Sequence, residues 1–356
     1  MEPAKSVYLY SQTLLKLKPT MNLITRVVLL LAFTGCSFCA SAQEDINELL
    51  KDNVADAGKL IGAYVEPLMK GVSLGLNQGW YNTAKPHKLI GIDITVNVSA
   101  LTVPSNQLQY EPGKLGLTKL ELQTNSPGYP YAPTIVGPDH SPLFQEKAPA
   151  PPGATTFQGP PGLDLKGNIG KAIIPIPVAT LGIGLPKSTD LKIRFAPTIN
   201  FGDKSTLKIF GIGVMHDVKQ WIPGIKLLPF DLSGFVGYTH MNVQTKFGSS
   251  SSSQDQKAVF DINATTVQGL ISKKFSVITF YGGIGYNIAK SNLAMKGTYD
   301  LGSGTTVKDP VDLKFAASGP RATIGFRLKL AVLTLHADYT AQKYNAINAG
   351  IGLSVR

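Results

Sequence analysis

The sequence contains little cysteine and little charge. Cysteine occurs only at Cys36 and Cys39 of 356 residues, and charged residues make up 16% of the chain. A soluble globular chain usually has about 25% charged residues. Both cysteines lie in a segment that we predict to be removed, which excludes a disulfide scaffold or a Cys-ligated metal site from the mature chain. Low charge and 36 glycines favour strands whose two faces contact different solvents.

Residues 26–42 read RVVLLLAFTGCSFCASA and indicate a secretory signal. A positive flank precedes an apolar stretch too short to span a bilayer, and small residues follow it. We therefore predict a signal peptide over residues 1–42, cleaved before Gln43. Met21 opens a better positively charged region than Met1, so we expect translation to begin there. A lipoprotein cleaved before Cys36 is the alternative.

Apolar residues recur at helical spacing over residues 44–68. Pro67 marks the predicted end of this helix, because proline removes a backbone donor. We predict a helical plug over residues 43–69 that closes or caps the periplasmic mouth of a barrel formed by residues 70–356.

From residue 71 onward the pattern changes to period two. In residues 88–100, apolar Ile92, Ile94 and Val96 alternate with polar Asp93 and Thr95. The same alternation recurs in four later segments, at 190–201, 321–330, 332–341 and 345–355. Strands that cross a bilayer need about 9 to 11 residues, which these segments match. The pattern predicts an all-β, antiparallel transmembrane β-barrel.

We predict about twelve strands, with a range of about ten to fourteen. The count of twelve is even, as in other barrels of this class. The predicted strands are 70–80, 88–101, 115–123, 170–183, 189–201, 205–217, 230–246, 256–272, 275–300, 311–329, 332–342 and 345–355. Tight turns at 186–189, 273–275 and 331 are expected on the periplasmic side. The Pro-rich segment 124–169 cannot form central strands and is expected to be a long extracellular loop.

Three segments carry a resemblance to a known group of proteins. Residues 211–240 (GIGVMHDVKQWIPGIKLLPFDLSGFVGYTH), 180–197 and the closing HADYTAQKYNAINAGIGLSV resemble an uncharacterised family of predicted outer-membrane barrels from Bacteroidetes-type bacteria. More distantly, a short N-terminal plug before a Gly-rich barrel looks like the FadL-type fatty-acid transporters, although no fatty-acid-binding residue can be matched. The resemblance implies the outer membrane of a Gram-negative bacterium. The chain departs from such barrels in ending on Val355-Arg356, without a terminal aromatic residue.

No catalytic motif is present. The G-x-S-x-G, H-E-x-x-H and P-loop patterns do not occur, so we expect no enzyme, no cofactor and no metal site. His336 and Asp338 share one strand face about 7 Å apart. Hydrolysis would require a third group, for which Ser354 and Thr334 offer no matching elbow.

Charged residues on the polar faces are the candidate ligand-binding set. They are Lys192, Arg194, Arg321, Arg327, Lys329, Asp93, His336 and Asp338. A net positive interior would hold an anionic solute or a carboxylate head group. The alternative is that these cations pair with lumenal acids and with four acids of the plug, Glu44, Asp45, Glu48 and Asp52.

Aromatic residues near predicted strand ends are expected to form an interfacial girdle. They are Trp80, Tyr81, Trp221, Tyr339 and Tyr344.

The predicted function is passive uptake or binding of a small amphipathic or anionic molecule. The alternative is a structural barrel that binds a protein partner through residues 124–169. Outer-membrane lipid is the expected surrounding, and no nucleic acid is expected as a partner. A soluble β-sandwich is disfavoured, because it would have to bury every apolar strand face.

Overall fold

The structure is a computed structural model that describes residues 54–148, 156–166, 170–201, 205–246, 256–300 and 306–355. These residues all belong to one compact unit. The predicted signal peptide and the four acids of the predicted plug lie outside the described residues. Within the described part of the chain, no helix is long and apolar enough to cross a membrane.

Ten antiparallel strands form a closed barrel, at the lower end of the predicted range. The strands are β1 (Ile92–Thr102), β7 (Ile173–Leu185), β8 (Thr189–Phe201), β9 (Ser205–Asp217), β10 (Asp231–Lys246), β11 (Lys257–Phe275), β12 (Ile278–Lys296), β16 (Gly319–Leu330), β17 (Leu333–Ala341) and β18 (Ala346–Val355). Neighbours in the chain pair with each other, and β1 pairs with β18 from Ile92↔Val355 to Leu101↔Ala346. The alternation therefore predicted the fold class correctly.

The remaining strands lie outside the ten-stranded ring. They are β2 (Gln109–Tyr110), β3 (Leu120–Leu122), β4 (Ala132–Pro133), β5 (Leu143–Glu146), β6 (Thr156–Gln158), β13 (Thr298–Asp300), β14 (Thr306–Lys308) and β15 (Val311–Ala316). Strand β15 pairs with β12 beyond the residues that β16 occupies. Two predicted barrel strands are wrong: residues 70–80 hold the end of a helix, and residues 115–123 form only β3, outside the ring.

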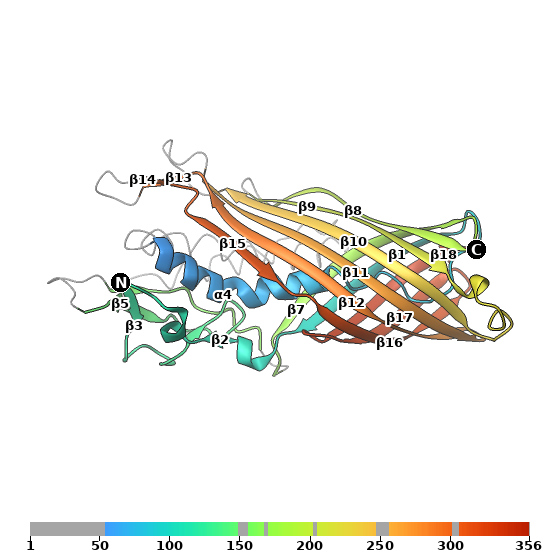
Figure 1. The fold of residues 1–356 in the computed structure, drawn as a ribbon, viewed down its shortest axis with the longest axis horizontal. Helices are drawn as coiled ribbons and strands as arrows, with labels where there is room; N and C mark the ends of the chain where they lie inside the picture. Colours follow the sequence, from blue (N-terminus) through green and yellow to red (C-terminus); the bar gives the residue numbers. More distant parts are fainter. Residues whose placement is uncertain are drawn as a thin grey trace, which may run out of the picture. The chain divides into compact units, whose positions relative to one another are not determined.

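The two ends of the barrel differ in their connections. At the turn end, residues 186–188, 276–277 and 331–332 join successive strands, and Lys187, Ser188, Ser276 and Ala331 have positive φ. The chain's last strand also finishes at this end (Figure 1). The opposite end, called the loop end below, carries the connection from β1 to β7 with strands β2 to β6.

Toward the turn end, the wall is apolar outside and polar inside. On β1, Ile92 and Ile94 are exposed by 44% and 53%, whereas Asp93, Thr95 and Asn97 are buried. The same arrangement holds on β18, where Ile351 and Leu353 are exposed and Ser354 is buried. These strands present an apolar outer band, as expected of a wall that lipid surrounds.

Toward the loop end, the polarity of β10, β11, β12 and β15 is reversed. Ile262 and Leu293 face inward and are buried, whereas Asp261, Asn263 and Asn292 face outward. Outward side chains bond to one another, as in Asn263 Nδ2 to Asp261 Oδ1 at 3.0 Å. The strand register does not change between the two regions. This part of the wall therefore encloses an apolar core and presents a water-compatible outer face.

Strands β7 and β8 separate toward the loop end. Each has 13 residues, yet they pair only from Leu185↔Thr189 to Leu181↔Ile193. Beyond that point β7 contains Pro175 and Pro177, which have no N–H to donate, and proline in sheets is confined to edges and bulges. The register of β8 on β9 shifts between Ala196 and Ile199. The wall is therefore open between these two strands at the loop end.

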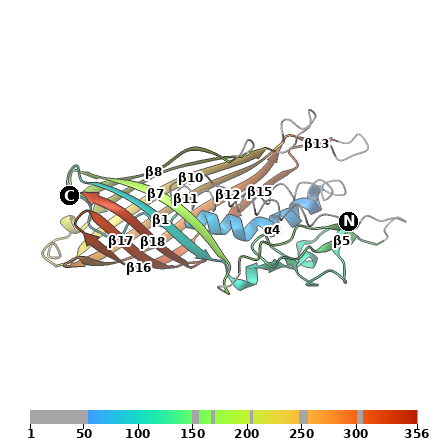
Figure 2. The same ribbon diagram turned by 180° about the vertical axis from the view of Figure 1, so that it is seen from behind.

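Helix α4 (Val54–Gly75) lies within the loop end of the barrel, beside β7, β12 and β15 (Figures 1 and 2). The prediction that it closes the mouth with the tight turns is wrong, because α4 lies at the opposite end. The predicted end at Pro67 is also wrong, since the helix continues through this buried proline to Gly75. Packing against the wall stabilises the helix more than local propensity disfavours it.

Glycine permits the close approach of α4 to β7. A Cβ at Gly75 would lie 2.5 Å from Cγ1 of Ile176, and one at Gly71 would lie 2.4 Å from Cδ1 of Ile174. Both isoleucines belong to the apolar core of the loop end, together with Met69. Larger residues at either position would push the helix away from the wall.

The beginning of α4 is fixed by one carboxylate. Fully buried Asp56 accepts hydrogen bonds from the backbone N–H groups of Thr118, Lys119 and Leu120, and from the Thr118 hydroxyl at 3.1 Å. Burial opposes ionisation of Asp56, but these donors outweigh it and lower its pKa. The carboxylate thereby joins the helix to β3 and the residues before it.

Candidate functional site in the barrel lumen

The chain itself fills the lumen. Residues 76–90, called the lumen segment below, connect α4 to β1. They pass from the helix at the loop end to the turn end, where the Ile90 N–H donates to the Gly184 carbonyl at 3.0 Å. Whether the helical plug lies inside the barrel could not be told from the sequence. In the structure the helix enters the barrel, and the segment after it closes the lumen.

Two inward-facing arginines bind the carbonyls of residues 76–78, directly after the C-terminal end of α4. Arg194 donates from Nη1 to the Leu76 carbonyl at 2.6 Å and from Nη2 to the Gln78 carbonyl. Arg321 donates from Nη1 to the Asn77 carbonyl at 2.9 Å. A helix leaves its last carbonyls without intrahelical partners, and its C-terminus carries partial negative charge. The last carbonyls of α4 accept backbone N–H groups of residues 76–78, and the two cations complement the partial negative charge of the helix end.

On the turn-end side of these arginines, aromatic packing closes the lumen and is called the aromatic seal below. The Trp80 ring lies 3.5 Å beneath Cζ of Arg194 and 5.6 Å from the ring of Phe235. The ring of Tyr81 lies 5.9 Å from Phe235 and 6.1 Å from Tyr281. Cation–π and edge-to-face contacts of this kind add to the burial of apolar area. The girdle prediction is therefore wrong for Trp80 and Tyr81, which are buried in the lumen.

The other girdle residues divide in the same way. Tyr344 is fully buried in the core of the loop end, so its prediction is also wrong. Trp221 and Tyr339 are exposed by 65% and 44%, as an outward aromatic requires. Sequence position could not separate these cases, because both groups lie close to the ends of predicted strands.

Hydrogen bonds hold the lumen segment to the wall along its length. Tyr81 Oη donates to Gln268 Oε1 at 2.6 Å, and Ser233 Oγ donates to the Ala84 carbonyl at 2.6 Å. The hydroxyls of Thr83 and Ser272 lie 3.2 Å apart. These contacts are all made by side chains of the wall and do not belong to the hydrogen-bonded ladder of the strands.

A cluster of charged and polar side chains lies between the aromatic seal and the turn end. The turn-end cluster consists of His87, Asp93, Asp190, Lys192, Arg327 and His336. His87 of the lumen segment contacts Asp190 at 2.8 Å through Nδ1 and through its backbone N–H. Lys192 lies 3.7 Å from the same carboxylate. The cluster therefore anchors the lumen segment at the turn end.

Several buried polar atoms of this region have no hydrogen-bond partner among the described residues. They are Oδ2 of Asp93, Nε and Nη2 of Arg327, Oγ1 of Thr334 and Nδ1 of His336. His336 uses its other nitrogen, Nε2, toward Asn97 Oδ1 at 2.7 Å. Buried polar groups are normally hydrogen-bonded, so the region is suited to hold water or a polar solute.

Residues 21–355 match a sequence family described as a family of unknown function, DUF6588. The chain belongs to the DUF6588 family. A comparison with curated proteins gives no significant match. The relation of this DUF6588 chain to FadL-type transporters and its Bacteroidetes origin stay predictions.

Solved structures similar to the DUF6588 barrel share little sequence with it. The attachment invasion locus protein Ail of Yersinia pestis is 7% identical, with 75% of this chain and 99% of Ail covered and a TM-score of 0.23. The autotransporter NalP translocator domain of Neisseria meningitidis is 10% identical, with 81% and 93% covered and a TM-score of 0.27. OmpT, an outer membrane protein of Vibrio cholerae, is 10% identical, with 74% and 97% covered and a TM-score of 0.22. Such scores carry no argument about function.

The predicted ligand-binding residues of the DUF6588 barrel all lie on inward-facing strand positions. Lys192, Arg194, Arg321, Arg327, Asp93, His336 and Asp338 are buried, and Lys329 is half-buried. Arg194 and Arg321 hold the helix end, whereas Asp338 accepts from Tyr281 Oη at 2.9 Å and from Asn348 at 2.8 Å. Lys329 donates to Ser354 Oγ at 3.1 Å. Their role in ligand binding stays a prediction.

The alternative that the lumenal cations pair with acids holds for one of them, and two others bind backbone carbonyls instead. Among the described residues, Lys192 approaches Asp190, while the two arginines of the helix end bind carbonyl oxygens. Sequence reasoning missed Asp190 and His87. Asp190 shares the period-two spacing of Lys192 and Arg194, and this spacing could have predicted that it also faces the lumen. His87 precedes β1 by five residues, and no pattern in the sequence marks it as lumenal.

Proposed function

We propose that this protein is an integral outer-membrane barrel for passive, non-enzymatic uptake or binding of a small amphipathic or anionic molecule. The apolar outer band of the wall supports the membrane location. The observation that carries the transport proposal is the lumen segment itself, which closes a pore-like interior through non-covalent contacts alone. Displacement of this segment opens the path between the loop end and the turn end.

The turn-end cluster supports an anionic or polar solute. The described barrel strands bury four cations, Lys192, Arg194, Arg321 and Arg327, and three carboxylates, Asp93, Asp190 and Asp338. The Nε and Nη2 atoms of Arg327 have no hydrogen-bond partner among the described residues. A guanidinium with free donors is suited to bind a carboxylate or phosphate in a bidentate manner. Arg327 is therefore our proposed contact for the solute once the segment has moved.

A structural, partner-binding barrel is the second candidate, and the seal favours it. Trp80 and Tyr81 form one buried apolar cluster with Phe235, Leu270 and Tyr281. Such a barrel would use its lumen segment to stabilise the wall and would not conduct. Its protein partner would bind through residues 124–169.

The test compares conductance of purified protein in planar bilayers with and without the seal. Trp80→Ala removes a buried aromatic worth about 3–5 kcal/mol, so we expect open events to rise by at least about 100-fold. Trp221→Ala, an exposed aromatic outside the lumen, is the matched control and should leave conductance unchanged.

A cross-link separates opening by the segment from general damage to the wall. In the Trp80→Ala background, Thr83→Cys with Ser272→Cys places two thiols where the hydroxyls lie 3.2 Å apart. Oxidation should abolish the open events, and reduction should restore them. Conductance that is unaffected by oxidation would contradict movement of the segment. A correctly folded Trp80→Ala barrel that stays silent would favour the structural candidate.

A further inference from the structure

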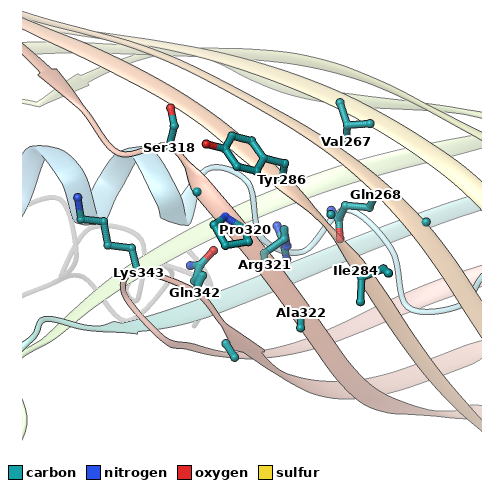
Figure 3. A pocket seen from close by; sticks show the side chains of 14 residues that line it. Val267, Gln268, Ile284, Tyr286, Ser318, Pro320, Arg321, Ala322, Gln342 and Lys343 are labelled. Carbon is teal, nitrogen blue, oxygen red and sulfur yellow. The ribbon is translucent and has the colours of Figure 1, made fainter.

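A groove of about 1170 Å³ lies on the barrel wall where β16 begins (Figure 3). Val267 of β11 and Ile284 and Tyr286 of β12 line one side. Pro320 and Ala322 of β16 line its floor, and Lys343 of the turn between β17 and β18 lies at its rim. The groove therefore combines apolar strand residues with a cation from a connection at the loop end.

Strand pairing explains why the wall is thin here. Strand β16 pairs with β12 up to Asn287↔Gly319, but with β17 only up to Ala322↔Ala341. Gly285 allows β12 to approach β11 closely beside the groove, because a Cβ there would lie 2.1 Å from the Val267 carbonyl oxygen. Gln342 closes the wall beneath the groove: Asn287 Nδ2 donates to its Oε1 at 2.8 Å.

The residues around the groove are of the kinds that contact membrane lipid. Val267, Ile284 and Tyr286 are outward-facing and exposed, and they continue the apolar band of the turn end. Outward Tyr286 lies on β12 between exposed Ile284 and the polar outward residue Asn292. Tyrosine prefers the boundary between hydrocarbon and head groups.

The charges at the groove have one sign. Its lining contains Arg321 and Lys343 and no acidic residue. Lys343 is exposed and forms no ion pair within the described part of the chain. Arg321 is buried, and its Nε has no hydrogen-bond partner among the described residues. A ligand with an apolar chain and a negatively charged head complements both features.

We propose that the groove binds an anionic membrane lipid, with an acyl chain along Ile284 and Ala322 and the phosphate beside Lys343. This inference rests on the membrane location in the proposed function but not on transport through the lumen. The lipid would cover the thin part of the wall from outside, over the side chain of Gln342. If Trp80→Ala shows no conductance in the lumen experiment, the proposed lipid site is therefore unaffected.

The experiment is native mass spectrometry of the delipidated full-length barrel with added phosphatidylglycerol. Ala322→Phe fills the groove from an outward, exposed position, and Ala349→Phe on β18 is the matched control at another outward, exposed position. We expect one lipid per wild-type barrel and per Ala349→Phe barrel. Ala322→Phe should reduce this occupancy by at least tenfold.

The head-group preference is tested separately with phosphatidylcholine, which has no net charge. Wild-type protein should bind phosphatidylglycerol several-fold more tightly, and Lys343→Gln should remove this preference while chain binding persists. Equal occupancy in Ala322→Phe and wild type, or no retained lipid in any variant, would overturn the proposal. Equal affinity of wild-type protein for the two lipids would overturn the assignment of the anionic head.

Discussion

Strand β11 passes through two environments without changing its register. Near the turn end it exposes Val267 and Ile271 and buries Gln268. Near the loop end it buries Ile262 and turns Asp261 outward. The alternation of side chains is continuous across both regions, so backbone geometry does not set the polarity. The surroundings do: apolar outside and polar inside at the turn end, and the reverse where the wall encloses α4.

This comparison explains how one strand serves two purposes. A β-strand offers two faces, and each face can be matched to water, lipid or a protein core independently along its length. Between these regions, Tyr238 of β10 donates to Asn263 Oδ1 at 2.6 Å. An aromatic ring with a polar tip is suited to such a boundary.

The largest effect is expected from removing core volume at the loop end. Ile262→Ala deletes a fully buried side chain that packs beneath α4, and should lower the free energy of unfolding by about 2–5 kcal/mol. Val267→Ala on the same strand, facing outward at the turn end, should cost about 1 kcal/mol or less. Urea unfolding of both variants in detergent measures the difference. Equal losses would mean that the two regions are not distinct.

A charge on the outer face should be tolerated in one region only. Ile94→Arg places a cation in the apolar band, where it should cost about 2–4 kcal/mol at mid-membrane depth. Asn263→Arg, outward at the loop end, loses the hydrogen bonds to Asp261 and Tyr238 and should cost only about 1 kcal/mol. Folding into phospholipid vesicles, followed by heat-modifiable gel mobility, compares the two. A well-tolerated arginine at position 94 would remove the argument for a lipid-facing band.

The contact between Asp56 and residues 118–120 should depend on pH. Asp56→Asn loses charge-assisted hydrogen bonds, and at neutral pH it should destabilise the loop end by about 1.5–3 kcal/mol. The pKa of Asp56 is lower in the folded state than its ordinary value of about 3.9. Its contribution is therefore complete above about pH 4 and is lost as the pH falls through the folded pKa.

Thermal unfolding of wild type and Asp56→Asn at neutral and strongly acidic pH measures this dependence. The gap between the two proteins should narrow in acid, because protonation removes the same charge as the substitution. A gap of the same size at both pH values would show that the carboxylate acts through shape alone.

Sequence alone predicted the barrel because the alternation of Ile92, Asp93 and Ile94 requires two different solvents. It also predicted that Arg194 and Arg321 face inward, since both lie on polar strand faces. It could not predict their partners, because the carbonyls of residues 76–78 carry no side-chain signal. Trp80 and Tyr81 were misplaced for a related reason: an aromatic near a strand end suits both a membrane interface and a buried lumen.

The predictions of the strand number and of the helix position failed because both depend on long-range packing. Residues 70–80 were predicted as a strand, but Gly71 and Gly75 bring a helix against β7, and only the three-dimensional contact shows why glycine is there. Pro67 was predicted to end the helix, although burial in the barrel keeps the helix intact on both sides of it. The end of the barrel that α4 enters depends on the path of residues 76–90, which no periodic pattern records.

The lumen segment is covalently attached at two points, to β1 at the turn end and to α4 at the loop end. Its 15 residues, 76–90, could span at most about 50 Å when extended. Strand β1, with 11 residues, rises only about 36 Å. The extended segment is therefore longer than the strand beside it, and it stays covalently bound at both ends when its side-chain contacts with the wall break. Any opening of this lumen is consequently reversible within a single molecule, at a rate that does not depend on protein concentration.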